Sequence, residues 1–221
     1  DLALLDSRKE EWARLALPAK IDLLRAVRRG VARVAERWVA AAVKAKGIPA
    51  GSPTEGEEWL AGPYSLLYAS GALERTLERL ARGESPLPGP AAVRVRPGGQ
   101  VVLRVFPGDA YDGILFSGVT ADVWMEPGVT IASLAHEAGG FYRQREPAGK
   151  LGLVLGAGNV ASIAPLDLLP QLYTEGAVAI VKMNPVNDYL RPFHEEAFAP
   201  LIERGFVRFA SGGADVGAYL C

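Results

Sequence analysis

A glycine-rich turn follows an apolar stretch at residues 150–162, KLGLVLGAGNVAS, and its residue types suggest two kinds of chemistry. Gly156, Gly158 and Ala161 satisfy the G-x-G-x-x-A form of the dinucleotide fingerprint, in which glycines let the backbone approach a diphosphate. Asn159 offers the other chemistry, because a side-chain amide can donate a hydrogen bond to a developing oxyanion. A plain strand-to-helix turn, with Asn159 capping the helix, is the third interpretation.

The dinucleotide fingerprint makes a demand that this sequence does not meet. An Asp or Glu is expected at the end of the second strand, about 20 residues on, to bind the ribose hydroxyls. Glu175 has about that spacing, but it precedes Gly176 and lies on a helix-to-strand turn at the wrong end of the strand. The carboxyl end of AVAIV carries Lys182 instead, a cation with three donors where an acceptor is expected.

These residues belong to a strand–helix–strand–helix–strand pattern that begins at Pro147. The expected strands are KLGLVLGAG, AVAIVKMNP and FVRFASG, and the expected helices are NVASIAPLDLLPQLYTEG and LRPFHEEAFAPLIERG. Continuous apolar runs are typical of parallel strands covered on both faces, and right-handed crossovers then give a doubly wound parallel sheet. Ligands of such sheets bind beyond the carboxyl ends of the strands. We therefore expect the site near residues 156–159, 182–187 and 211–213.

The residues before the sheet predict helices and then a β-rich excursion. Apolar residues recur at steps of three and four over residues 10–46, and shorter helices are expected at 55–59 and 64–82. The arginines between the apolar positions are interpreted as a solvated helix face. A proline-rich boundary follows at 84–92.

Alternating residues on both sides of Pro97-Gly98-Gly99 predict a hairpin, and further strands are expected around 113–117 and 121–125. TIASLAHEAGGFYRQ is expected as a short helix or turn with His136 on its polar side. The expected organisation is a helical layer over 1–90, the excursion over 91–145 and the βαβαβ part over 146–221.

The composition excludes several classes of partner. The 24 Lys and Arg residues balance 25 Asp and Glu residues, whereas nucleic acid and anionic lipid both require clustered positive charge. No apolar run reaches the roughly 20 residues that cross a bilayer, and residues 1–8 lack a signal-peptide design. We therefore expect a cytoplasmic protein that binds neither nucleic acid nor membrane. The single cysteine, Cys221, excludes a disulfide framework and a cysteine-rich metal site, and no metal is expected.

The order REPAGKLGLVLGAGN, a helix, AVAIVKMNP, and then APLIERGFVRFASGGADVG resembles the N-terminal part of the aldehyde dehydrogenase superfamily. In that family an Arg-Glu-Pro-x-Gly segment leads into the first strand, an Asn ends that strand, and a Lys ends the second. The opening helices also look like the family's N-terminal helical layer, and the hairpin region resembles its oligomerisation excursion. The likeness extends over most of the chain, but its specific motifs lie within residues 145–217. It implies a Rossmann-like coenzyme sheet and a homo-oligomer in the full-length form.

Residue by residue, the resemblance implies NAD(P)-dependent oxidation of an aldehyde to an acid. Asn159 would be the oxyanion donor that steadies the thiohemiacetal formed when a cysteine attacks the aldehyde. Lys182 would hold the adenosine ribose of NAD, or the 2′-phosphate of NADP. In this family the coenzyme lies across the sheet without the usual diphosphate loop. The resemblance therefore implies that the glycines shape the turn, whereas Asn159 takes part in catalysis. Further coenzyme contacts are implied for Gly158, Asn184, Pro185, Gly212 and Gly213.

Departures from the family pattern leave alternatives open. The family commonly has Lys-Pro-Ser/Ala-Glu after the second strand, whereas this chain has KMNP, and the missing Glu leaves both NAD and NADP as candidates. GNVAS is closer to the acyl-CoA reductase branch, so an acyl thioester is a second substrate class. An ordinary G-x-G-x-x-A oxidoreductase is another alternative. The last is a non-catalytic assembly module, in which Asn159 is a cap and Lys182 a surface charge.

The two ends of the sequence predict a piece of a longer protein. Asp1 is not an initiator Met, and Cys221 stands in what is expected to be the last turn of a helix. The nucleophilic Cys and general-base Glu of the family would lie beyond Cys221, which has no His nearby to activate it. We therefore expect the 221 residues alone to lack dehydrogenase activity and to expose an apolar sheet edge or face.

Overall fold

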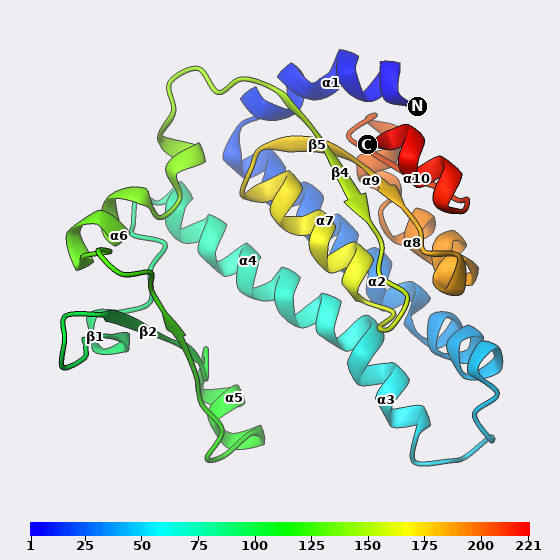
Figure 1. Ribbon diagram of the computed structural model, residues 1–221, viewed down its shortest axis with the longest axis horizontal. Coiled ribbons are helices and arrows are strands. Elements are labelled where there is room, and N and C mark those ends of the chain that lie inside the picture. Colours follow the sequence, from blue (N-terminus) through cyan, green and yellow to red (C-terminus); the bar gives the residue numbers. More distant parts are fainter. The chain divides into compact units, whose positions relative to one another are not determined.

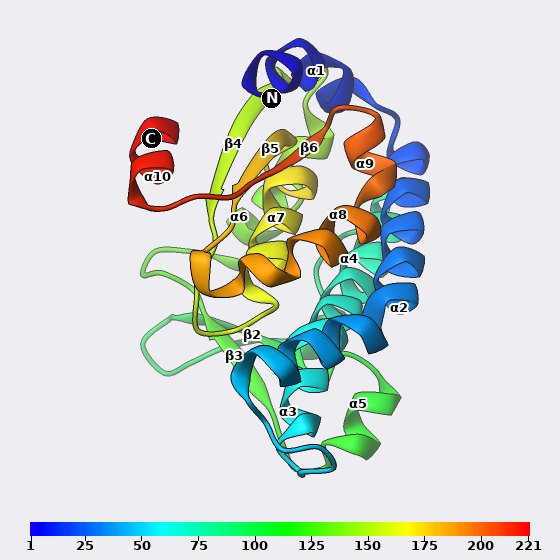
Figure 2. The same cartoon turned by 90° about the vertical axis from the view of Figure 1, so that its right-hand side faces the viewer.

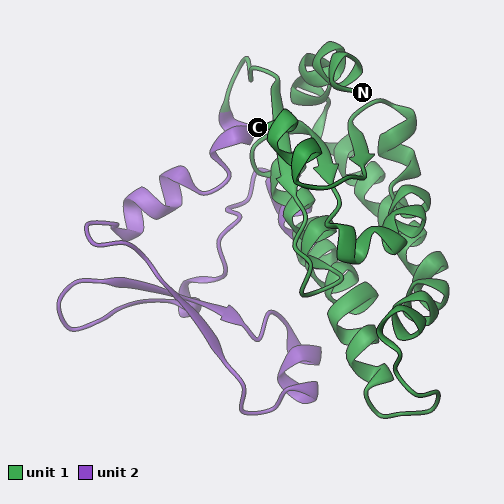
Figure 3. Ribbon diagram, turned by 45° about the vertical axis from the view of Figure 1, so that its right-hand side comes forward, with its two compact units in different colours: residues 1–74, 144–221 green, residues 75–143 purple.

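A computed structural model describes residues 1–221, which divide into two compact units. The first unit comprises residues 1–74 and 144–221, and the second comprises residues 75–143 (Figure 3). The second unit therefore begins inside a helix, at Arg75, whereas the sequence analysis starts the excursion at residue 91. The residues predicted to form the site all belong to the first unit.

Helices form the first part of unit 1. α1 (Leu2–Arg14) and α2 (Leu17–Lys46) are separate helices, because the chain is extended at Leu15 and Ala16 and Pro18 occupies the first turn of α2. α2 ends at Gly47, whose φ of 63° is left-handed. α3 (Glu55–Trp59) follows, and a π-helical segment η1 (Leu60–Tyr64) leads into α4 (Ser65–Ala81), which crosses into unit 2.

Three parallel strands form the sheet of unit 1. β4 (Lys150–Leu155), β5 (Ala177–Lys182) and β6 (Val207–Ala210) lie in the order β4-β5-β6 (Figure 2). α7 (Ile163–Tyr173) connects the first two strands (Figure 1). The connection from β5 to β6 contains the 3₁₀ segment η4 (Pro185–Leu190), α8 (Arg191–Ala197) and α9 (Ala199–Glu203). After β6 comes α10 (Ala214–Leu220). The predicted strand and helix alternation and the parallel pairing are confirmed.

Burial differs sharply between the strands. All six residues of β5 are buried, and both α1 and α7 contact this strand. β4 lies at the edge of the sheet, and the only buried residue in it is Val154. The prediction that the apolar β4 run is covered on both faces is therefore wrong. Leu151 and Leu155 are 42% and 52% exposed, which agrees with the expected apolar edge.

Aromatic side chains anchor the helices onto this sheet. The Trp12 ring of α1 lies 5.5 Å from the ring of Tyr173 in α7 and 5.0 Å from that of Phe206, and its Nε1 donates to the Leu172 carbonyl at 3.0 Å. All three rings are buried. Burying large aromatic surfaces stabilises the packing of α1 against the sheet, which fixes the strands that carry the predicted site.

Unit 2 contains a second, antiparallel sheet. β1 (Val93–Val95) and β2 (Val101–Phe106) form the predicted hairpin, and β3 (Ala121–Trp124) pairs with β2. The strand expected at 113–117 is wrong, because residues Ala110–Leu115 form helix α5, whose N-terminus the Asp109 side chain caps. The remaining elements are the 3₁₀ segments η2 (Pro90–Ala92) and η3 (Gly140–Arg143) and the helix α6 (Ile131–Glu137), which ends close to the exposed His136.

The chain is thus a mixed α/β protein whose unit 1 carries a small three-stranded parallel sheet.

Candidate functional site

The carboxyl ends of the three parallel strands meet at one edge of the sheet. Leu155, Lys182 and Ala210 are aligned in register across β4, β5 and β6. Lys182 is itself a predicted site residue, and the turns that follow the three strands carry the other six, namely Gly158 and Asn159 after β4, Asn184 and Pro185 after β5, and Gly212 and Gly213 after β6. We call this region the carboxyl edge.

The glycines of the first turn allow two loops to approach each other. The Gly156 amide donates to the Lys182 carbonyl at 2.8 Å. A Cβ at Gly156 would lie 3.1 Å from that carbonyl oxygen, and a Cβ at Gly158 would lie 3.0 Å from Oδ1 of Asn184. Neither glycine has a positive φ. The space that each missing side chain leaves is therefore filled by the neighbouring loop of the protein, as expected if the glycines serve geometry.

Asn159 is an exposed residue in the middle of the first turn. α7 begins only at Ile163, with Ser162 at the N-cap position, so the interpretation of Asn159 as the helix cap is wrong. The expected helix start at 159 is likewise wrong, because the turn continues to Ser162, whose amide donates to the Ala61 carbonyl at 3.1 Å. The Asn159 side chain makes no hydrogen bond within the chain and is exposed. Its amide is therefore available to a ligand.

Lys182 is the last residue of β5 and is 8% exposed. Its ammonium group makes no ion pair or hydrogen bond within the chain. Lys150, at the opposite end of β4, differs in both respects, because it is exposed and its Nζ lies 3.2 Å from Oε2 of Glu175. Its Nζ is not enclosed in the core, so the unpaired ammonium group of Lys182 can reach a ligand that brings an acceptor oxygen.

Asn184 has a structural task beside the glycine turn. Its Oδ1 accepts a hydrogen bond from the Val186 amide at 3.0 Å and so caps η4, and Pro185 occupies the first position of that segment. The close contact with Gly158 places the Asn184 side chain between the two loops. The Asn184 Nδ2 group makes no hydrogen bond within the chain, so the side chain can cap η4 and also face a ligand.

Two polar residues of η4 join the loops of the carboxyl edge. Asn187 lies inside the expected range 182–187 but had no assigned role, and Asp188 lies one residue beyond that range. Asn187 is 4% exposed, and its Nδ2 donates to the Ala157 carbonyl at 3.0 Å. Asp188 accepts a hydrogen bond of 2.5 Å from the Ser211 hydroxyl, which in turn accepts one of 2.9 Å from Arg191. The available signal was two adjacent polar residues shortly after a strand whose only polar residue is Lys182.

Gly212 meets a strict steric demand in the third turn. Its φ is +141°, and a Cβ there would lie 2.4 Å from Cγ2 of Val216. Gly213 is less confined, because its Cβ would meet only the Asp215 carboxylate at 3.0 Å. The glycine pair therefore allows α10 to fold back closely after β6.

His194 lies in the core and carries no open site. It is fully buried on α8, and its ring centroid is 4.7 Å from that of Trp38. Neither ring nitrogen has a hydrogen-bond partner, and burial lowers the pKa of His194 to about 3. The imidazole is thus neutral at physiological pH.

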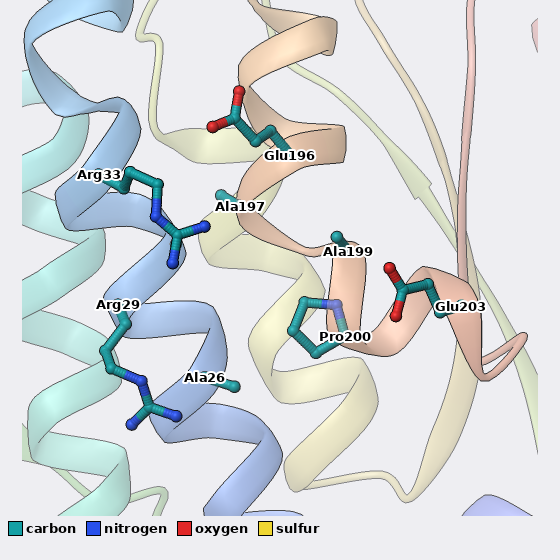
Figure 4. A pocket seen from close by; sticks show the side chains of 9 residues that line it. Ala26, Arg29, Arg33, Glu196, Ala197, Ala199, Pro200 and Glu203 are labelled. Atoms are coloured by element: carbon teal, nitrogen blue, oxygen red, sulfur yellow. The ribbon is translucent and has the colours of Figure 1, made fainter.

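A pocket of about 330 Å³ lies between α2 and the α8–α9 region and contains none of the predicted site residues (Figure 4). Gly30 allows the helices to approach, since a Cβ there would lie 2.5 Å from the Ala197 carbonyl oxygen. Arg29 and Arg33 line one wall but are exposed. Glu196 is already bound by Arg37 at 2.6 Å, and this hydrogen bond is the main reason that the pKa of Glu196 is lowered. The pocket therefore resembles a solvated, charge-balanced helix crossing.

No three His, Cys, Asp or Glu side chains gather closely enough to hold a metal ion. No helix combines the length and apolar character needed to span a bilayer.

In comparisons with known proteins, no family model matches this chain, and no curated protein matches it significantly.

Proposed function

We propose that the carboxyl edge binds NAD or NADP in an oxidoreductase of the aldehyde dehydrogenase type. One observation carries the proposal: the parallel register puts the exposed amide of the Asn159 turn and the buried, unpaired Lys182 at the same end of adjacent strands. Under this proposal the three strands are the first part of a doubly wound, Rossmann-like sheet. Ligands of such sheets bind beyond the carboxyl ends of the strands.

The donor groups of the carboxyl edge suit a ribose or a phosphate. Lys182 offers donors only, and ribose hydroxyl and phosphate oxygens accept hydrogen bonds. An ordinary diphosphate loop is less well supported, because Asn184 already occupies the space beside Gly158 and α7 begins four residues beyond Asn159. When bound, the oxidised coenzyme would accept a hydride in aldehyde oxidation, and the reduced coenzyme would donate one in the reduction of an acyl thioester.

Asn159 would act on the substrate and not on the coenzyme. Its exposed amide would donate to the oxygen of the reacting carbonyl as negative charge develops there. The proposal assigns the nucleophilic cysteine and the general base to no residue of 1–221. The substrate would be an aldehyde or, in the related branch, an acyl thioester. The complete protein would work as a cytoplasmic homo-oligomer.

Lys182→Ala tests the coenzyme assignment. We expect the dissociation constant for NAD or NADP, measured by titration calorimetry, to rise about tenfold or more, because a charge-assisted contact is lost. Lys150→Ala is the matched control, since Lys150 lies at the other end of the sheet. Equal affinity in both variants and the unmodified protein would support the assembly-module alternative.

Asn159→Ala tests the role in catalysis, in the complete enzyme. Removing an oxyanion donor lowers kcat by roughly 10² to 10³. Coenzyme affinity should stay unchanged, because Asn159 is assigned to the substrate carbonyl. A near-normal kcat with either an aldehyde or an acyl thioester would refute this role.

A further inference from the structure

The segment η4 contacts both neighbouring turns of the carboxyl edge through adjacent residues. Asn187 donates to the Ala157 carbonyl in the turn after β4, and Asp188 accepts from Ser211 in the turn after β6. η4 itself follows β5 through Met183 and Asn184. η4 is therefore hydrogen-bonded to the turns that follow β4 and β6, the two strands that flank β5 in the sheet.

The turn after β4 has few other anchors. At its two ends the Gly156 amide donates to the Lys182 carbonyl and the Ser162 amide donates to the Ala61 carbonyl. Among the residues between these ends, the hydrogen bond from Asn187 joins the turn to a separate element. The other hydrogen bond in this stretch is local, from the Ile163 amide to the Val160 carbonyl at 3.4 Å. Asn159 lies two residues after the carbonyl that Asn187 holds, and its own side chain makes no hydrogen bond within the chain.

We infer that Asn187 is a positioning residue, which holds the turn that carries Asn159 at a fixed distance from the loop that follows Lys182. The effect on coenzyme and substrate rests on the proposed function, whereas the effect on the turn does not. Asn187 is suited to this task because it is buried, which shields its hydrogen bond from competing water. Without the donor, the Ala157 carbonyl would lose its partner and the turn would become mobile.

The test compares Asn187→Asp and Asn187→Ala with Val186→Ala. Asn187→Asp keeps the side-chain volume and replaces the donor with a carboxylate, which repels the Ala157 carbonyl. Val186 is the control, because it lies on the same 3₁₀ turn but is 68% exposed. The first measurement is the ¹⁵N order parameter of the Ala157, Gly158 and Asn159 amides.

We expect order parameters near 0.85 in the unmodified protein and below about 0.6 in both Asn187 variants. Val186→Ala should match the unmodified protein. The second measurement is the calorimetric dissociation constant for NAD and NADP, which should rise about tenfold in the Asn187 variants, as the loss of one hydrogen bond implies.

The outcomes separate this inference from the proposed function. Unchanged order parameters in the Asn187 variants would overturn the positioning role, whatever the dissociation constant for the coenzyme. A mobile turn in the variants, with no coenzyme binding even by the unmodified protein, would support the positioning role and contradict the proposed function. If both variants fail to fold, the unmodified protein decides, because order parameters below about 0.6 in its turn would overturn the inference.

Discussion

Replacing Gly158 with alanine tests the close approach of the two loops at the carboxyl edge. The new Cβ would lie 3.0 Å from Oδ1, and 3.1 Å from both Cγ and Nδ2, of Asn184. These separations are well inside ordinary van der Waals contact, so one of the two loops must move. The Asn184 side chain cannot move freely, because its Oδ1 caps η4 through the Val186 amide.

The expected magnitude follows from two opposing effects. Overpacking in a tight site costs about 1–3 kcal/mol. Alanine also restricts the unfolded chain, which stabilises the folded state by about 0.4–1 kcal/mol where the backbone conformation is compatible, and Gly158 has no positive φ. We therefore expect Gly158→Ala to lower the free energy of unfolding by about 1–2 kcal/mol.

A double-mutant cycle identifies the cause of this loss. In an Asn184→Ala background the opposing side chain is gone, so Gly158→Ala should become neutral or stabilising by up to about 1 kcal/mol. The assay is urea unfolding of the four proteins, followed by circular dichroism, with equal slopes against urea. The same loss in both backgrounds would refute the argument that Asn184 fills the space beside Gly158.

Two other predictions concern the packing of unit 1. Gly30→Ala should lower the free energy of unfolding, measured in urea, by about 2 kcal/mol or more, because its Cβ would meet the Ala197 backbone at 2.5 Å. Gly56→Ala is the control and should be neutral or stabilising, because the space around Gly56 is open. Equal changes in the free energy of unfolding for the two variants would contradict this packing. The pKa of His194 is lowered to about 3 in the folded state and is near 6.5 in the unfolded state. The contribution of the neutral His194 side chain to the free energy of unfolding is therefore fully present above pH 6.5. As the pH falls from 6.5 to 3, the free energy of unfolding decreases by at most about 1.4 kcal/mol per pH unit. Urea unfolding across this range should lose that slope in His194→Phe but keep it in His136→Phe, and an unchanged slope in His194→Phe would count against a buried neutral imidazole.

The gathering of Asn159 and Lys182 at one edge could be predicted from the sequence. The first apolar run leads through two glycines to Asn159, and the second ends in Lys182. Two parallel strands of equal length bring these ends together. The hairpin was predictable for a similar reason, since the alternating apolar pattern on both sides of Pro97-Gly98-Gly99 permits one pairing register.

Three other features could not be predicted, two of them because they depend on contacts between residues far apart in the sequence. The apolar run of β4 predicts burial, but its exposure is set by its place in the sheet, where it lies at the edge beside β5. The apolar run GILF at residues 113–116 is too short to distinguish the periodicity of a strand from that of a helix. The Asp109 side chain caps α5 and so stabilises the helix. The role of Asn187 depends on a carbonyl 30 residues earlier in the chain, which no local pattern indicates.

The most direct measurement is a titration of the ¹⁵N-labelled protein with NAD and with NADP, followed by amide chemical shifts. We expect saturable shifts in three segments, Gly156–Asn159, Lys182–Asn184 and Ser211–Gly213, which lie together at the carboxyl edge. The amides around the α2 pocket, at Arg29 and Arg33, should not shift. An absence of saturable shifts at the carboxyl edge, or shifts centred on the α2 pocket, would contradict the assignment of the coenzyme site.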